Sequence, residues 1–296
     1  MRIVILGAGA VGGYFGGLLA KAGEDVFFVA RGKHLEALRS QGLTIRKPDN
    51  TFTIPVEASA DPRAAERADL IVVCVKAYDT DAACAPCGVI VGPTTRVLTL
   101  QNGLGNRERL SNHFPADSIF EGVAYVASEV SRPGVIQWAA AGRTVVGPSP
   151  VSADLKARFD RAGAPCEIAE NIEQAIWEKL VANAVFNVMA TVERCSLGDL
   201  LKEPRRESCE RAVDELTAVA AAHGIVVRPD ARERSWTFCT DHPDFPSSTQ
   251  QDLAHGKPLE TEALSGELVR RAHVVGVPVP THELLYRRLI ALKNDS

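Results

Sequence analysis

The sequence predicts two domains, an α/β domain of the doubly wound type followed by an all-α domain. Three observations lead to this prediction. A glycine-rich segment directly follows an apolar strand at the start of the chain, strand and helix patterns alternate through the first half, and helical periodicity dominates after residue 170. The 296 residues, 46% of them hydrophobic, are enough for two cores. We therefore expect domains at 1–169 and 170–296.

The first domain is expected to contain a largely parallel sheet. The segment 68–76 is apolar almost throughout, as a parallel strand covered on both faces requires. Helices are predicted from the glycine-rich segment to 22, at 34–41 and at 153–161. Strands are predicted at 2–6, 25–31, 68–76 and 96–100, with shorter extended segments at 43–46, 52–54, 119–126, 135–138, 144–146 and 166–168.

The second domain is expected to be built from helices alone. The apolar periodicity predicts helices at 172–192, 205–223, 231–238, 260–275 and 281–293. A two-domain chain of this kind commonly binds its ligand between the domains, so we expect a cleft there.

The glycine-rich segment after the first strand predicts dinucleotide binding in a Rossmann-type domain. Its first glycine permits a tight turn, the second lets the backbone approach a pyrophosphate, and the third allows the helix to pack closely on the strand. The phosphates are then bound by the N-terminal end of the helix. The predicted cofactor-binding residues of this segment are Gly7, Ala8, Gly9, Ala10, Val11 and Gly12.

The same segment also allows a membrane or secretory interpretation. Residues 3–20 contain no charge, and their glycines have Gly-x-x-x-Gly spacings that suit helix packing in lipid. However, a second strand follows at once, and Gly23 is placed to end the helix. We therefore favour the dinucleotide-binding interpretation.

The end of the second strand indicates NADP rather than NAD. NAD-binding domains of this type usually carry an acidic residue there, which binds the ribose 2′-hydroxyl. In this chain the strand ends at Arg31 and is followed by Gly32 and Lys33. Two cations suit a 2′-phosphate, although a solvated basic loop is the alternative explanation.

Composition narrows the classes of partner and the compartment. The net charge is −4 and no basic run exists, which argues against a nucleic-acid partner. Seven cysteines scattered through the chain favour reduced thiols in the cytoplasm. Cys84 and Cys87 have the spacing of a thiol redox pair but do not directly follow a strand, as that motif does. The histidines lack metal-ligand spacing, so we expect no metal. A homodimer is compatible with the sequence, which does not determine the oligomeric state.

A line of polar residues on an apolar helix predicts a catalytic face. Lys179, Asn183 and Asn187 are spaced i, i+4 and i+8 and so share one side of an α-helix. An unpaired polar group on a buried face costs about 1–3 kcal/mol, so these residues are expected to face a polar ligand. A solvent-facing stripe is the alternative.

Further candidates lie at the ends of strands and helices. Lys76 and Asn102 each follow the carboxyl end of a predicted strand, where ligands bind in open α/β sheets. Ser248 is placed to begin a short helix, and Glu260 lies near the start of the next apolar helix.

Taken together, these segments resemble the ketopantoate reductase (2-dehydropantoate 2-reductase) family over nearly the whole chain. The segments that carry the resemblance are Gly7–Gly12, Val75-Lys76, Gln101–Gly105, Trp177–Lys179 with Asn183 and Asn187, Ser248–Asp252 and Glu260. The resemblance implies NADPH-dependent reduction of a 2-oxo acid, first of all 2-dehydropantoate to pantoate in pantothenate biosynthesis.

The resemblance also implies roles for single residues. By this resemblance, Lys179 occupies the position of the family's general acid, and Asn183, Asn187 and Ser248 occupy the positions of its substrate contacts. The residues assigned to the cofactor are Arg31 at the 2′-phosphate, Lys76 and Asn102 near the nicotinamide ribose, Ala127 through its backbone, and Glu260 in the network that joins cofactor and substrate.

One position departs from the family pattern. Members with established pantoate chemistry carry an asparagine contact before the glycine that follows the catalytic helix, whereas this chain has Leu197 before Gly198. A site that pairs a substrate hydroxyl discriminates strongly through that pairing. A reductase of another 2-oxo or 3-oxo acid is therefore the main alternative, and a non-enzymatic NADPH sensor is a more distant one.

Overall fold

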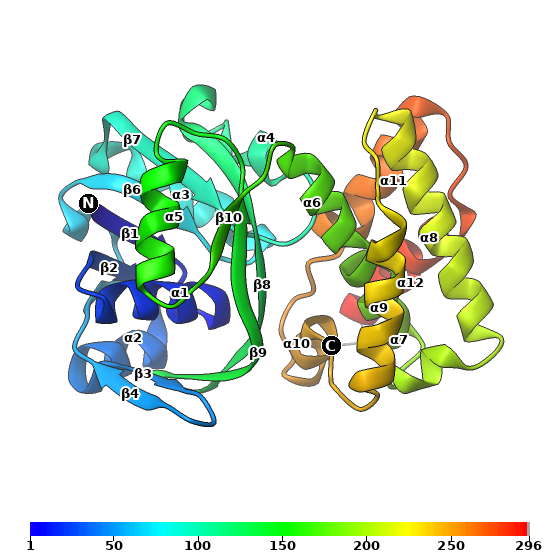
Figure 1. Cartoon of the computed structure of the whole chain (residues 1–296), viewed down its shortest axis with the longest axis horizontal. Helices are drawn as coiled ribbons and strands as arrows, with labels where there is room; N and C mark the ends of the chain where they lie inside the picture. Colours follow the sequence, from blue (N-terminus) through cyan, green and yellow to red (C-terminus); the bar gives the residue numbers. More distant parts are fainter. Residues whose placement is uncertain (295–296) are drawn as a thin grey trace. The chain divides into compact units, whose positions relative to one another are not determined.

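The computed structural model describes residues 1–294 and divides them into two compact units. The first unit comprises Met1–Gln101 and Asn106–Ile172. The second contains the chain from Glu173 onward together with the short segment Asn102–Gly105 (Figure 1). A loop of the α/β half of the sequence therefore packs with the helical half.

Six parallel strands form the centre of the first unit. Their order is β5-β2-β1-β6-β7-β8, which corresponds to the 3-2-1-4-5-6 order of doubly wound domains. The predicted parallel sheet is thus confirmed. The strands are β1 (Arg2–Leu6), β2 (Asp25–Val29), β5 (Glu57–Ser59), β6 (Ala68–Val73), β7 (Val91–Thr99) and β8 (Ile119–Arg132).

Each face of this sheet has its own apolar core, because successive side chains of a strand point to opposite faces. Ile3 and Ile5 of β1 belong to the core that includes residues of α1 (Ala10–Lys21), α2 (Gly32–Gln41) and α5 (Ser152–Arg161). Val4 and Leu6 belong to the core on the other face, with residues of α3 (Thr80–Cys84) and α4 (Asn106–Leu110). Figure 1 shows α1 and α5 in front of the sheet.

A long antiparallel hairpin extends the sheet and corrects the predicted strand pattern. The segments predicted at 119–126, 135–138 and 144–146 are two continuous strands, β8 and β9 (Val135–Val146). The strands β3 (Leu43–Arg46), β4 (Thr51–Ile54) and β10 (Cys166–Ile168) continue from β9, so the ten-stranded sheet is mixed beyond its parallel centre.

The second unit is entirely helical, as predicted. A single apolar core runs through it and includes Trp177, Phe186 and Leu216, all at most 2% exposed. Its α-helices are α6 (Ile172–Leu180), α7 (Val188–Val192), α8 (Arg205–Ala222), α9 (Pro229–Asp241), α10 (Ser248–Ala254), α11 (Glu267–Val275) and α12 (Pro280–Asn294).

Two helices of this unit contain π-helical turns, which the sequence did not predict. The residues Val181–Asn187 form a π segment between α6 and α7, and Glu262–Gly266 form another before α11. The two segments contact each other. π turns are rare and occur frequently at functional sites. The predicted α-helical register therefore holds only as far as Leu180.

The membrane interpretation finds no helix to support it in the described part of the chain. Within residues 1–294, every helix is too short or too polar to cross a bilayer.

Candidate functional site

The turn after β1 has the geometry that its glycines predict. Gly7 has φ +97°, and a Cβ built there would lie 2.8 Å from the backbone nitrogen of Val75. A Cβ at Gly12 would lie 2.1 Å from the carbonyl oxygen of Gly7. The N–H groups of Gly7 and Ala8 both donate to the carbonyl of Val29, at 3.1 Å. Side chains at positions 7 and 12 would therefore break the turn.

Gly9 has a different environment, and this environment fits a dinucleotide. A Cβ built on Gly9 would meet no atom within 4 Å, so the backbone faces open space at this point. Gly9 is also the N-cap of α1, where no side chain caps the helix and the first turn carries no acidic residue. The positive end of the helix dipole is thus available to an anion such as a pyrophosphate.

The other cofactor candidates of the first unit follow the ends of neighbouring strands. Arg31 is exposed and is the N-cap residue of α2, although its side chain makes no capping hydrogen bond. Lys76 follows β6 and lies next to Val75, which packs against the glycine turn. The Gln101 amide donates to the Val75 carbonyl at 2.9 Å and to the Thr80 hydroxyl at 2.8 Å, so it ties the loop after β7 to the loop after β6.

Ala127 lies in β8 opposite Ala140 of β9. Its side chain is partly buried.

The candidate acid Lys179 lies in the helical unit, in the last turn of α6. Its Nζ donates to Oδ1 of Asn102 at 2.7 Å. The loop that carries Asn102 is anchored to Ala263. Gly103, with φ +87°, sits against the Ala263 carbonyl, and the N–H of Leu104 donates to this carbonyl at 2.9 Å. The structure therefore brings together two candidates that are 77 residues apart in the sequence.

Burial has a larger effect on the pKa of Lys179 than the neighbouring negative charge does. Loss of hydration lowers the pKa of the Lys179 ammonium from 10.5 to about 8, and the nearby charge of Glu260 opposes this effect. Glu260 is 8% exposed. At neutral pH the ammonium is thus still charged but holds its proton much less firmly than an ordinary lysine.

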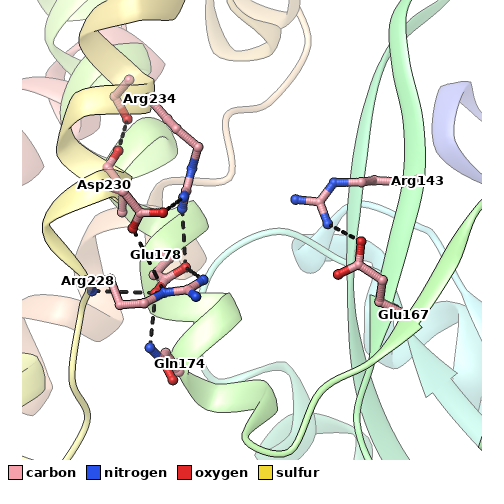
Figure 2. A network of polar contacts seen from close by, with 9 residues as sticks. Arg143, Glu167, Gln174, Glu178, Arg228, Asp230 and Arg234 are labelled. Carbon is pink, nitrogen blue, oxygen red and sulfur yellow. Dashed lines mark hydrogen bonds and ion pairs between the residues drawn. The ribbon is translucent and has the colours of Figure 1, made fainter.

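Glu178, next to Lys179 in the sequence, is a buried acid to which sequence reasoning gave no role. Figure 2 shows it at the centre of a polar network. Arg228 donates to both carboxylate oxygens, at 2.6 and 2.9 Å, and Arg234 and the Gln174 amide each donate at 3.2 Å. Although burial raises the pKa of Glu178, the contacts with Arg228 hold it below its usual value. The sequence feature that could have identified Glu178 is the presence of an acidic residue within a strongly apolar helix.

A pair of amides, Asn183 and Asn187, lies on the π segment. Asn187 donates through Nδ2 to Oδ1 of Asn183 at 3.0 Å, so the two predicted substrate contacts share a face. Asn183 is 9% exposed, and Asn187 is partly buried.

Ser248 is exposed and is the first residue of α10. The helix is capped by Ser247 in a capping box with Gln250, whose amide also donates to the Cys195 carbonyl at 2.9 Å. This confirms the predicted short helix.

Two other sequence features have structural explanations. Cys84 and Cys87 are free thiols at most 1% exposed in an apolar core, and burial raises the pKa of both, that of Cys87 to about 12. Reactive thiols need a lowered pKa and access to solvent, so this pair is structural.

Leu197 is 2% exposed in the core of the helical unit and offers no polar group to a ligand. In residues 1–294 no group of three or more His, Cys, Asp or Glu side chains could hold a metal ion.

Comparison with known proteins identifies the family. Residues 3–150 match the sequence model described as ketopantoate reductase PanE/ApbA, and residues 171–293 match that of its C-terminal domain. The chain belongs to the ketopantoate reductase family. This confirms the resemblance and the fold class that the sequence predicted.

Individual members of the ketopantoate reductase family resemble the chain over almost its full length. A 2-dehydropantoate 2-reductase of Halobacterium salinarum is 35% identical, with 94% of this chain and 95% of the relative covered. The crystal structure of a PanE/ApbA family ketopantoate reductase from Ralstonia eutropha has a TM-score of 0.94 and 34% identity, covering 100% and 99% of the two chains. A D-mandelate dehydrogenase with NADH, at 21% identity and a TM-score of 0.93, shows the fold alone.

Proposed function

We propose that the chain is an NADPH-dependent 2-dehydropantoate 2-reductase in which Lys179 is the general acid. The observation that carries this proposal is the Lys179 ammonium, whose pKa burial lowers to about 8 while Asn102 accepts a hydrogen bond from it. The full-length relatives named 2-dehydropantoate 2-reductase support the substrate, and the family implies NADPH.

The reaction adds a hydride to the carbonyl carbon and a proton to the carbonyl oxygen of a 2-oxo acid. NADPH, when bound, supplies the hydride. Lys179 stabilises the negative charge that develops on the oxygen and then transfers a proton from Nζ to it, leaving a neutral amine and a 2-hydroxy acid. An acid works best when its pKa lies near the working pH. With a pKa of about 8, roughly nine-tenths of the lysine is protonated at pH 7.

Asn102 and Glu260 keep the ammonium ready for this transfer. The Asn102 oxygen accepts a hydrogen bond from Nζ and so fixes the direction of one N–H bond of Lys179. The charge of Glu260 raises the pKa of Lys179 against the effect of burial, so the lysine is not neutralised at pH 7.

Substrate binding is assigned to Asn183, Asn187 and Ser248. A carboxamide both donates and accepts hydrogen bonds, and the contact of Asn187 with Asn183 at 3.0 Å holds the two amides in one orientation. The hydroxyl of Ser248 is exposed at the start of its helix and can serve a carboxylate or hydroxyl of the substrate.

Cofactor binding is assigned mainly to the predicted residues of domain 1–169 and substrate binding mainly to domain 170–296, although the cofactor residues Asn102 and Glu260 belong to the second compact unit. The glycine turn and the N-terminus of α1 would hold the pyrophosphate, and Arg31 the 2′-phosphate. Lys76, Asn102 and Glu260 are assigned to the nicotinamide end, and Ala127 to a backbone contact. Asn102 lies three residues beyond the end of β7, and in open α/β sheets ligands bind at this edge of the strands.

The deciding experiment measures NADPH oxidation with a panel of 2-oxo acids that differ in the hydroxyl and the gem-dimethyl group. We expect 2-dehydropantoate to have the highest kcat/KM. A preference for an analogue without the hydroxyl would favour the alternative reductase, which the apolar position of Leu197 allows. NADPH binding without turnover of any panel member would instead favour a sensor. A homodimer and a cytoplasmic location remain predictions, the first to be checked by sedimentation.

A further inference from the structure

Two side chains outside the assigned site bind carbonyl oxygens of the glycine-rich turn. The Nε2 atom of His34, on α2, lies 2.8 Å from the carbonyl oxygen of Ala8. The hydroxyl of Ser128, on β8, donates to the carbonyl oxygen of Ala10 at 3.1 Å. No role was assigned to either residue above, and both contacts lie within the first unit.

The tautomer of His34 follows from its second contact. The backbone N–H of Gly134 points at Nδ1 of His34, with a nitrogen–nitrogen distance of 3.1 Å, so Nδ1 is the acceptor. Nε2 therefore carries the proton and donates it to Ala8. Gly134 is held in turn by Thr44 of β3, whose N–H donates to the Gly134 carbonyl at 2.9 Å. His34 thus connects the turn to the sheet through a defined hydrogen-bond chain.

Ser128 is directed to the turn by an irregularity of its strand. The pairing of β8 with β9 shifts register between Ala127 and Ser128. Bulges of this kind redirect side chains and are common next to active sites. The same hairpin packs on α1, where a Cβ at Gly13 would come within 2.8 Å of Ile136. The register shift and the packing of the hairpin on α1 therefore bring the Ser128 hydroxyl to the Ala10 carbonyl.

These contacts support the orientation of two peptide units at the start of α1. A peptide unit is planar and trans, so its C=O and N–H bonds point in opposite directions. The Ala8 carbonyl shares its peptide unit with the N–H of Gly9, and the Ala10 carbonyl shares its unit with the N–H of Val11. In each of these peptide units the N–H therefore points away from the side chain that binds the carbonyl.

We infer that His34 and Ser128 are positioning residues that orient the Gly9 and Val11 N–H groups toward the cofactor pyrophosphate. This inference rests on the proposed NADPH-dependent function. The open space at Gly9 and the uncapped N-terminus of α1 are the features that such oriented N–H groups would serve. Neither side chain touches the cofactor in this arrangement, since each acts through the peptide unit that it binds.

The test compares two ligands on the wild type and on the variants His34→Ala, Ser128→Ala and the double variant. NADPH carries the pyrophosphate, whereas adenosine 2′-phosphate carries the adenine, ribose and 2′-phosphate without it. We expect the Kd of NADPH to rise roughly tenfold in each single variant and further in the double variant, because hydrogen bonds to a charged group are strong. The Kd of adenosine 2′-phosphate should stay within about twofold, because its contacts do not involve the turn.

Two further variants separate positioning from a general structural role. His34→Gln keeps a donor and an acceptor on one side chain and should restore much of the NADPH affinity. Ser131→Ala removes a hydroxyl from the same strand whose contact, to the Val135 carbonyl, does not reach the turn, and should bind NADPH like the wild type. With saturating NADPH, kcat of the Ser128→Ala variant should be close to that of the wild type.

The outcomes that overturn the inference are distinct. NADPH binding unchanged in the double variant, or an equal loss for both ligands, would show that these residues do not aim the N–H groups. A wild-type chain that fails to bind NADPH at all would overturn the proposed function itself, and this inference with it. Calorimetric titration measures all of these binding constants without any turnover.

Discussion

Replacing Lys179 with methionine should lower activity and raise stability at the same time. Methionine keeps an unbranched apolar stem but has no ammonium, so it removes the proton donor with little change in packing. General acid catalysis contributes roughly 10²–10⁴ to a rate. We therefore expect kcat to fall by about that factor, while the Kd of NADPH, which is bound by other groups, changes little.

The stability gain follows from the burial of the charge. A fall in the pKa of Lys179 from 10.5 to about 8, at about 1.4 kcal/mol per unit, means that the folded chain carries a cost of about 3 kcal/mol when the lysine is protonated. The methionine variant avoids this cost but loses the hydrogen bond to Asn102, which contributes about 1 kcal/mol. At pH 7 the free energy of unfolding should thus rise by about 2 kcal/mol.

The pH dependence gives the same argument a second test. Because the folded pKa lies below the unfolded one, the unfolded chain binds more protons between pH 8 and 10.5, and the lysine makes wild-type stability rise with pH across that window. In Lys179→Met this contribution is absent. Wild-type kcat/KM should fall as pH rises through about 8, because the proton donor is lost.

Urea titrations at pH 7, 8, 9 and 10 measure the stability of both chains, and initial rates over the same range give the activity profile. A matched control is Lys202→Met, at an exposed lysine of the helical unit, which should leave the activity profile unchanged and alter the free energy of unfolding by less than about 1 kcal/mol. An unaltered kcat in Lys179→Met would remove the lysine from the acid role. A variant less stable than the wild type at pH 7 would show that burial does not lower its pKa.

Four further variants test other positions of the first unit. Arg31→Asp should weaken NADPH binding at least tenfold while NADH binding holds or improves, because a carboxylate repels a 2′-phosphate but accepts a ribose hydroxyl; aspartate also suits this N-cap position, so circular dichroism should show an intact fold. Gly9→Ala should fold normally and lose NADPH affinity in calorimetry, whereas Gly12→Ala should lose thermal stability, since only the second side chain meets protein atoms. Replacing both Cys84 and Cys87 with alanine should lower the melting temperature. Thiol reagents and reductants should leave kcat unchanged in both the wild type and this variant. A kcat that depends on redox conditions in the wild type but not in the variant would contradict this.

The sequence predicted the parts of the fold that depend on local pattern. The glycine turn, the continuous apolar strand at 68–76 and the helical second half all follow from short-range periodicity, and the structure contains them. The long hairpin was missed because residues 139–142 read Ala-Ala-Ala-Gly, which are poor strand formers. Pairing with β8 along its whole length overrides that weak preference.

The site was predicted as a set of residues but not as an arrangement. The polar line made Lys179, Asn183 and Asn187 candidates because the surrounding helix is so apolar. The hydrogen bond of Lys179 to Asn102 joins positions 77 residues apart, and no local pattern carries that information. The π segment also has no sequence signal, and it begins just after the lysine, where the helix changes from α to π hydrogen bonding.

The contrast between two adjacent residues shows what the site requires of a proton donor. Glu178 is buried and keeps its charge, because Arg228 binds both its oxygens and Arg234 adds a third ion-pair contact. Lys179 is also partly buried, but its pKa remains lowered because the charge of Glu260 offsets only part of the cost of burial. A group that must give up a proton in each turnover is served by a lowered pKa, whereas one that only holds helices together is not. If neighbouring charge offset the whole cost of burial, the pKa of Lys179 would return to an ordinary value and the lysine would be a weaker acid, so the lowered pKa is the property on which the proposed catalysis depends.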